Sequence, residues 1–177
     1  MPNKPITSLG LTLPEVVTTV CISGILATVA IPNFMNAISN NRSTSISNQV
    51  VATLAYSRSE AIKRGQQVTI KHKGTTLKVW DNGWDIFADS NGDGTMNNTD
   101  ELLKTYEALP EGYTLRTGGN YASWVAFLAM GNSRGATGLA NDRFSLCDSS
   151  RKKAQSRVII ISKVGRVRTE TGKAECQ

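Results

Sequence analysis

The apolar run near the start of the chain constrains its fold more than any other feature. Residues 11–31 are hydrophobic apart from Pro14, Glu15 and a few Ser and Thr residues. As an α-helix these 21 residues would extend over roughly 31 Å, enough to cross the hydrocarbon core of a bilayer. A short polar leader precedes the run, and the small-residue cleavage site of an ordinary secretory signal does not follow it. The sequence therefore predicts one membrane-spanning helix, with any cleavage occurring before it.

The junction between leader and apolar run, Gly10-Leu-Thr-Leu-Pro-Glu15, resembles the cleavage signature of type IV prepilins. The resemblance implies a leader over residues 1–10, which a prepilin peptidase removes by cutting after Gly10 and then methylating the new N-terminus at Leu11. Two residues depart from the usual pattern, since Leu11 replaces the common Phe and Pro14 replaces an aliphatic residue. Proline is well tolerated in the first turn of a helix, because its missing N–H would have no partner there.

Glu15 places a carboxylate inside the predicted membrane helix, where an ionised side chain is costly and normally has a partner. The pilin resemblance implies that this glutamate pairs with the N-terminal amine of a neighbouring subunit during fibre assembly. A carboxylate at the helix start that reaches the bilayer interface is the alternative interpretation. Pro32 also fits the resemblance, because pilin helices commonly carry a kinking proline at this depth. We therefore expect residues 11–32 to form the transmembrane and assembly part of the helix.

Beyond residue 32 the helical pattern becomes amphipathic. Apolar residues recur on one face at three-to-four spacing: Ile46, Val50, Leu54 and Ala61. The predicted amphipathic part covers residues 33–64 and ends where two basic residues precede Gly65, a typical helix cap. The sequence of residues 56–64, YSRSEAIKR, resembles a segment of the GspH/FimT family of minor pilins and pseudopilins.

After Gly65 the hydrophobic period changes to the two-residue alternation of strands. Strands are expected around five alternating pairs: Val68/Ile70, Leu77/Val79, Trp84/Ile86, Tyr113/Leu115 and Val125/Phe127. Residues 102–106 also favour a strand, and residues 158–161 are typical of a strand buried on both faces. No linker or repeat divides the head, residues 65–177. The sequence therefore predicts an α+β fold, in which a long N-terminal helix packs on a small antiparallel β head.

The net charge of +6 comes from the end of the chain. Residues 1–150 hold 12 Lys or Arg and 12 Asp or Glu, whereas residues 151–177 hold eight basic and two acidic residues. A basic end favours a polyanionic partner or an anionic membrane surface, although a solvated face without a partner has the same composition. Cys147 and Cys176 flank this region and are expected to close the head with one disulfide in an oxidising compartment. Cys21 lies in the apolar run as a small hydrophobe.

Residues suited to catalysis are sparse. His72 is the one histidine of the sequence and lies in a predicted strand, where we expect a surface position. No Ser/His/Asp set, zinc-ligand spacing or phosphate-binding loop is apparent. We therefore expect no enzymatic activity and no required cofactor.

Residues 89–100 match a 12-residue calcium-binding loop at six positions. The candidate ligands carry side-chain oxygens around a glycine turn: Asp89, Asn91, Asp93, Asn97 and Asp100. The twelfth position is Asp instead of the usual bidentate Glu, although Glu101 follows, and the flanks favour strands instead of helices. A polar hairpin loop without metal is the alternative interpretation. Calcium is thus a candidate ligand of this loop.

Residues 158–168, followed by Cys176, resemble the strand–turn–strand end of the GspH/FimT family. The sequence Gly165-Arg166-Val-Arg168 has the Gly-Arg-x-Arg form associated with DNA-binding minor pilins of the FimT kind. Two arginines at this spacing on an extended segment project to one side, and each can bind a phosphate. The candidate DNA-binding residues belong to this module and to the disulfide loop: Arg166, Arg168, Lys163, Arg151, Lys152 and Lys153. A structural turn whose arginines brace the fold is the alternative interpretation.

These features predict a minor type IV pilin that binds double-stranded DNA without sequence preference, for DNA uptake in natural transformation. Two alternatives remain open: a structural, FimU-like minor pilin that primes pilus assembly, and a GspH-like pseudopilin of a type II secretion system. The expected partners are other pilin subunits, DNA, prepilin peptidase and the bacterial inner membrane before assembly. We expect a single-pass inner-membrane protein with its head in the periplasm, which later joins a pilus fibre or tip at the cell surface.

Overall fold

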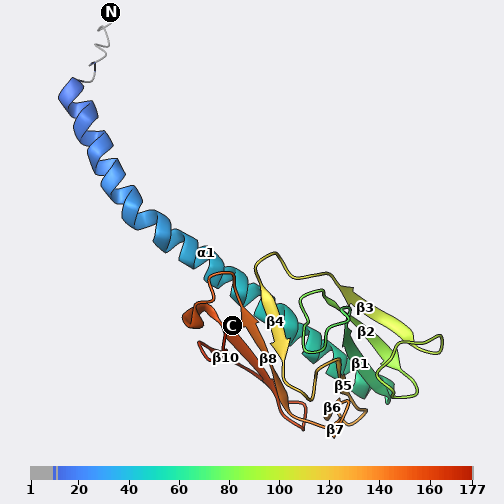
Figure 1. Ribbon diagram of the computed structural model, residues 1–177. Coiled ribbons are helices and arrows are strands. Elements are labelled where there is room, and N and C mark those ends of the chain that lie inside the picture. The colour runs from blue at the N-terminus through green and yellow to red at the C-terminus, as the bar shows by residue number, and fades with distance from the viewer. Residues whose placement is uncertain (1–9, 11, 177) are drawn as a thin grey trace, which may run out of the picture. The chain divides into compact units, whose positions relative to one another are not determined.

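The computed structural model describes residue 10 and residues 12–176, with the side chain of residue 139 excepted. The predicted leader residues 1–9 and the predicted first mature residue, Leu11, lie outside the described residues. The chain divides into two compact units, Met1–Ile38 and Ser39–Gln177. One long helix, α1 (Leu13–Arg64), contributes to both units, and the described strands all follow it (Figure 1).

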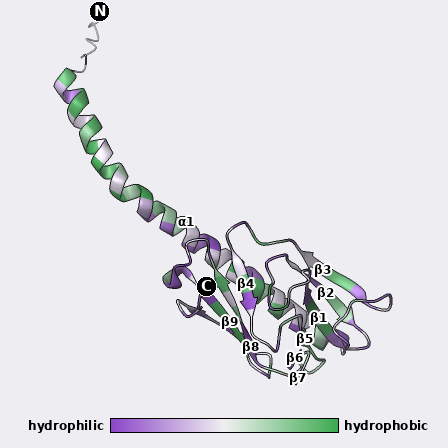
Figure 2. Cartoon of the chain, viewed as in Figure 1, coloured by the Kyte–Doolittle hydropathy of each residue, from purple (hydrophilic) through white to green (hydrophobic). Residues whose placement is uncertain are grey.

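In the N-terminal unit, α1 is an exposed apolar helix. Its large hydrophobic side chains are solvent-accessible, for example Leu13, Ile25 and Phe34, and Figure 2 shows the hydrophobic colouring along this part of the helix. By length and composition, α1 is able to cross a membrane, and its apolar stretch has no buried residue. The helix continues through Pro32 without interruption. An apolar N-terminal helix is therefore present, as the sequence predicts.

In the second unit, the remaining part of α1 forms one wall of the head's core. The predicted apolar stripe is buried, since Ile46, Val50, Leu54 and Ala61 are each at most 5% exposed. The helix ends at Arg64, and the amide of Gly65 donates to the carbonyl oxygen of Ala61 over 3.0 Å. Gly65 has a φ of +67°, the left-handed conformation of a glycine helix cap. The predicted stripe and helix end are both confirmed.

Six strands form the first antiparallel sheet, here called sheet A, among the described residues. Their order across the sheet is β3-β2-β1-β5-β6-β7. Their bounds are β1 (Gln67–His72), β2 (Trp84–Asp89), β3 (Glu101–Tyr106), β5 (Trp124–Phe127), β6 (Ser133–Gly135) and β7 (Gly138–Leu139). The long β2–β3 connection contains the candidate calcium loop.

The second sheet, here called sheet B, has four antiparallel strands in the order β10-β9-β8-β4. Their bounds are β4 (Thr114–Thr117), β8 (Asp142–Cys147), β9 (Arg157–Ile161) and β10 (Val167–Thr171), and a 3-10 helix, η1 (Lys153–Gln155), precedes β9. Alternate residues of sheet B point into the core, including Leu115, Phe144, Leu146, Ile159 and Ile161. The opposite, outer face carries the candidate DNA-binding arginines.

The core of the head lies between α1 and the two sheets and is rich in aromatic side chains. Its largest fully buried members include Trp80, Trp84, Tyr121, Phe127 and Phe144. The two fully buried indoles in this core are hydrogen-bonded, because Trp80 Nε1 donates to the Tyr121 carbonyl oxygen (3.2 Å) and Trp84 Nε1 donates to Thr53 Oγ1 (3.3 Å). The α+β architecture agrees with the prediction.

Three local expectations differ from the structure. Leu77 and Val79 do not form a strand: Leu77 is 62% exposed in a turn, and Val79 makes only an isolated bridge to Arg116. Strand β8 has no counterpart among the predicted strands. His72 is buried against Trp80 instead of lying on the surface, because it faces inward on the central strand β1.

Candidate nucleic-acid interface

The turn between β9 and β10 holds the Gly-Arg-x-Arg sequence. The amide of Gly165 donates to the carbonyl oxygen of Ser162 (2.8 Å), and the amide of Ser162 donates to the carbonyl oxygen of Arg166 (3.0 Å). Gly165 has a φ of +75°, a conformation that glycine adopts without the penalty of a Cβ. These bonds are typical of a tight hairpin turn closed by a left-handed glycine. Lys163 and Val164 therefore occupy the exposed end of the hairpin.

Arg58 of α1 holds this turn in place. Its Nε donates to the carbonyl oxygen of Gly131 (3.0 Å), and its Nη2 donates to the carbonyl oxygen of Val164 (3.2 Å). A Cβ on Gly165 would lie 2.0 Å from the Gly131 carbonyl oxygen. Packing, as well as backbone conformation, therefore requires glycine at position 165.

A shallow groove runs along the outer face of the hairpin. Its lining residues come from β9, the turn, β10 and the residue before β8: Asn141, Ile160, Ile161, Ser162, Lys163, Val164, Arg166 and Arg168. Three of these carry a positive charge and none is acidic. Lys163, Arg166 and Arg168 are all exposed, so their cationic groups are available to an anion in this groove.

Strand register adds a fourth cation that sequence reasoning missed. Ile160 of β9 pairs with Arg168 of β10 on one side and with Arg143 of β8 on the other. Paired residues point to the same face of a sheet, so the exposed Arg143 and Arg168 flank Ile160 with Cβ atoms about 10 Å apart. In the sequence, the alternation Arg-Phe-Ser-Leu of β8 indicates a strand with Arg143 on its polar face.

Acidic neighbours of these cations are few. Arg168 Nη2 lies 3.5 Å from Glu170 Oε1, a contact between exposed groups that solvent weakens. Within the part of the chain that the structure describes, Lys163 and Arg166 form no ion pair. The groove therefore keeps most of its positive charge uncompensated.

The remaining candidate cations lie elsewhere on sheet B. Arg151 lines a second groove with Arg116, Glu175 and Cys147, at the end of β8 away from Arg143. Cys147 is four residue steps along the strand from Arg143, a distance of about 13 Å. Lys152 and Lys153 are exposed at the start of η1. The structure thus brings Arg166, Arg168 and Lys163 together but does not place Arg151 in their groove.

Arg157, another basic residue of the C-terminal region, has a structural position. It is 7% exposed, and its guanidinium donates to two side chains of α1 and to two backbone carbonyl oxygens. The acceptors are Asn40 Oδ1 (2.6 Å), Thr44 Oγ1 (3.1 Å) and the carbonyl oxygens of Gln155 and Ser156 (both 3.0 Å). Its charge is therefore used inside the head and is not part of the basic surface.

The predicted disulfide is present between Cys147 and Cys176, with a Cα–Cα distance of 5.7 Å. It joins the end of β8 to the C-terminal segment, and Val158 and Ala174 pack against it. A bridge of this kind keeps a C-terminal segment from fraying. Cys21 is a free, exposed cysteine of the N-terminal unit.

The candidate calcium loop is closed by its own hydrogen bonds. Asp89 is buried, and its carboxylate accepts bonds from the amides of Gly92 (2.7 Å) and Gly94 (2.9 Å) and from the side chains of Gln67 and Thr69. Asn91, Asp93 and Asn97 likewise accept bonds from nearby loop amides. Among the described residues, no three acidic, His or Cys side chains gather as metal ligands. Calcium binding stays a prediction, which isothermal titration at millimolar calcium would test.

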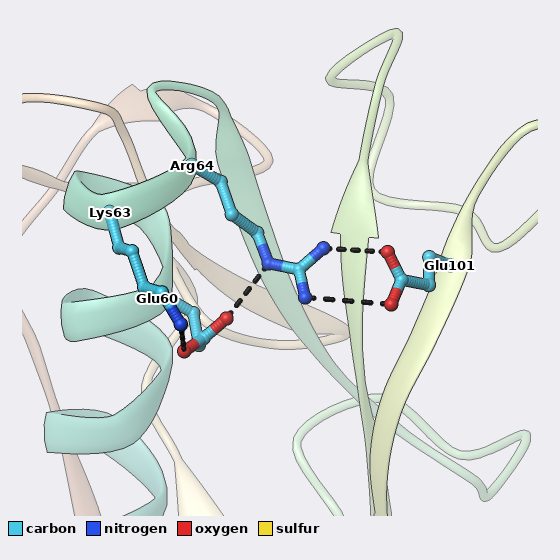
Figure 3. A network of polar contacts seen from close by, with 4 residues as sticks. All are labelled: Glu60, Lys63, Arg64 and Glu101. Carbon is cyan, nitrogen blue, oxygen red and sulfur yellow. Dashed lines mark hydrogen bonds and ion pairs between the residues drawn. The ribbon is translucent and has the colours of Figure 1, made fainter.

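Asp100 and Glu101 are also engaged within the protein. Burial works to raise the pKa of Asp100, but bonds from the amides of Ser90 and Asn97 outweigh it and hold that pKa below its usual value. Figure 3 shows that the carboxylate of Glu101 faces Arg64 at the end of α1, with 2.6 Å between Arg64 Nη1 and Glu101 Oε2. Arg64 also contacts Glu60, whose pKa it lowers. Glu101 therefore links helix to sheet instead of facing the loop.

His72 offers no catalytic arrangement. It is 6% exposed, and its Nδ1 has no hydrogen-bond partner among the described residues. Burial, assisted by the neighbouring Lys71 charge, lowers the pKa of His72, so the ring is neutral near pH 7. A neutral imidazole packed 5.7 Å from the Trp80 ring is a core side chain.

The predicted processing and assembly residues lie in the N-terminal unit. Gly10 is exposed, and a Cβ there would contact nothing. Glu15 lies in the first turn of α1, with Thr12 Oγ1 3.5 Å from its Oε2. Pro32 is inside α1. These positions leave the roles implied by the pilin resemblance as predictions.

Comparisons with known proteins support the same fold. The family model described as "Type II transport protein GspH" matches residues 47–165. Two crystal forms of the type IV minor pilin FimU from Pseudomonas aeruginosa are similar in structure, each 21% identical in sequence. The first has a TM-score of 0.63 and covers 77% of this chain and 96% of FimU; the second has a TM-score of 0.59 and covers 76% and 99%. No curated protein matches the chain in sequence.

The family match includes the last 18 residues of α1 and most of the head, well over half of the chain. The FimU similarity, at its low identity, concerns the fold alone. Both agree with a helix that packs on an antiparallel β head. The chain therefore belongs to the GspH family and is a type IV pilin-like protein.

Proposed function

We propose that this chain is a minor type IV pilin that binds duplex DNA without sequence preference and serves DNA uptake in natural transformation. The observation that carries the proposal is the convergence of Lys163, Arg166 and Arg168 in one exposed groove that has no acidic lining residue. Arg143, in register beside Ile160, extends the cationic face by one strand.

The chemistry of the groove favours phosphate over other ligands. Guanidinium groups form charge-assisted hydrogen bonds with phosphate oxygens, and long exposed basic side chains can follow the spacing of a nucleic-acid backbone. Contacts with the backbone carry no base information and release counterions. Three or four such contacts predict a log–log slope of affinity against salt of about −3.

The second candidate function is that of a pseudopilin of a type II secretion system, which the family's description favours. The family match ends at residue 165, so Arg166 and Arg168 lie just beyond it. The match supports the helix and the β head, whereas the DNA proposal rests on the arginines that follow. A structural role in pilus assembly agrees with the same fold.

A binding titration tests the DNA proposal. The full-length chain in uncharged detergent should bind a 20-base-pair duplex, and Arg166→Gln with Arg168→Gln should weaken that binding at least tenfold. Lys78→Gln with Lys104→Gln is the matched control, because it removes two exposed positive charges outside the groove. Equal affinity of the arginine variant and the control variant would exclude this groove as the DNA site.

Experiments in cells separate the candidate functions. If the chain serves DNA uptake, a strain with the arginine double variant should make pili and secrete protein normally but lose transformation. Loss of pili on deletion of the gene, with no effect of the arginine variant, would favour the assembly role. Loss of protein secretion would favour the pseudopilin role.

A further inference from the structure

Two hairpin turns of the head share one geometry and lie against each other. In the β5–β6 turn, the amide of Gly131 donates to the Leu128 carbonyl oxygen (2.7 Å), as Gly165 donates to Ser162 (2.8 Å) in the β9–β10 turn. The two glycines have φ values of +79° and +75°. The amide of Ser133 also donates to the Lys163 carbonyl oxygen (3.0 Å), which joins the two turns directly.

Each turn presents a large apolar side chain just before its glycine. Met130 is 84% exposed and Val164 is 63% exposed. Ile62 of α1, 53% exposed, lies beside the β5–β6 turn, since its Cδ1 would be 3.1 Å from a Cβ added to Gly131. We call these three side chains the tip surface. Arg58 binds the backbone of both turns through the carbonyl oxygens of Gly131 and Val164, so the backbone that carries Met130 and Val164 is held in place.

The charge around the tip surface indicates a polyanionic partner. The segments 128–134 and 162–168, which form the two turns and their flanks, contain no Asp or Glu. Three of their basic residues, Lys163, Arg166 and Arg168, line the hairpin groove, whereas Arg134 donates to Gln67 Oε1 of β1. Val164 also lines the basic groove beside Lys163 and Arg166. The apolar tip surface is therefore continuous with the groove that is proposed to bind DNA phosphates.

Dimensions decide which part of a duplex fits. Each turn ends a two-stranded ribbon whose strand axes lie about 5 Å apart, so the two turns can enter a groove only one after the other along its length. The major groove of B-form DNA is about 12 Å wide and admits such an element, whereas the minor groove, about 6 Å wide, does not. The apolar groups on the floor of the major groove are the C5-methyl groups of thymine.

We propose that the tip surface enters the DNA major groove, where Met130 and Val164 contact thymine methyl groups and bias an otherwise non-specific site toward A·T-rich duplex. This inference rests on the proposed DNA-binding function and names the part of the DNA that the head reads. Basic side chains of the groove contact the phosphates alongside, and Arg58 acts as a positioning residue for both turns.

A thymine-to-uracil exchange tests the inference, because it removes the C5-methyl group and leaves the phosphates unchanged. The full-length chain in uncharged detergent should bind an A·T-rich 20-base-pair duplex about fivefold more tightly with thymine than with uracil. Met130→Ser with Val164→Ser should abolish this preference without changing the salt slope. Leu77→Ser, which alters an apolar side chain that is 62% exposed in another turn, should keep it.

The outcomes distinguish the two proposals. Equal affinity of the wild-type chain for the thymine and uracil duplexes, with binding still dependent on Arg166 and Arg168, would overturn the major-groove inference and leave DNA binding intact. Competition by the minor-groove ligand netropsin would also overturn it. Absence of binding to either duplex would overturn the proposed function, and this inference with it.

Discussion

Replacing Gly165 by alanine should disrupt the β9–β10 turn far more than an ordinary glycine substitution. A non-glycine residue in the left-handed region costs about 1–2 kcal/mol. The added Cβ would lie 2.0 Å from the Gly131 carbonyl oxygen, so one backbone segment must move. That movement would weaken the two Arg58 hydrogen bonds, each contributing about 1 kcal/mol. We therefore expect the free energy of unfolding to fall by about 3 kcal/mol.

Gly65→Ala is the matched control. Gly65 has a similar φ of +67°, but a Cβ there would meet nothing within 4 Å. The free energy of unfolding of this variant should therefore fall only by the cost of a left-handed alanine, about 1 kcal/mol. Urea unfolding of the Ser39–Gln177 unit, followed by tryptophan fluorescence, measures both variants. Equal losses for the two variants would refute the contact between the two turns and the role assigned to Arg58.

Three further perturbations test the head. Replacing Cys147 and Cys176 by alanine removes a bridge across a sequence separation of 29 and should lower the free energy of unfolding by about 3.6 kcal/mol; a loss below about 1 kcal/mol would contradict this. Arg157→Ala leaves four acceptors without their donor and should cost about 3 kcal/mol, whereas Arg143→Ala on the exposed face should cost less than about 0.5 kcal/mol; equal losses by urea unfolding would show that Arg157 is not buried. Burial holds the pKa of His72 below its usual value near 6.5, so the unfolded chain binds a proton first as pH falls. Stability should therefore decrease below about pH 6.5, and His72→Gln should flatten that decrease; an unchanged pH profile in this variant would refute the assignment.

The helix and its burial were predictable because their signals are local. A helix needs only nearby residues to form its hydrogen bonds, and Gly65 marks its end through its own conformation. The buried face follows from the spacing of Ile46, Val50 and Leu54, which places them on one side of α1.

The sheets were less predictable because strand pairing is non-local. Leu77 and Val79 have the alternation of a strand, but turns flank them and no neighbouring strand pairs with them beyond one bridge. Strand β8 pairs with β9 and β4, and its position beside Ile160 brings Arg143 to the groove. Sequence spacing alone does not reveal that register, since Arg143 and Arg168 are 25 residues apart along the chain.

The candidate site shows why a charge count is a poor guide to a binding surface. The C-terminal region supplies eight basic residues, yet their positions serve different purposes. Arg157 is buried against α1, Arg151 lies in a second groove with Glu175, and Arg166 and Arg168 share the hairpin groove. Burial and strand register separate these residues, and neither is encoded in the local composition.

The segment of α1 that resembles the GspH/FimT family has structural roles at several of its charged positions. Arg58 holds the two turns, and Glu60 pairs with Arg64, which in turn binds Glu101 of β3. Ala61 is fully buried. These contacts attach the helix to both sheets, so any relative with this fold has reason to keep them, whatever its head binds. The family match covers residues 47–165, so the test of DNA binding must address the exposed side chains beyond residue 165.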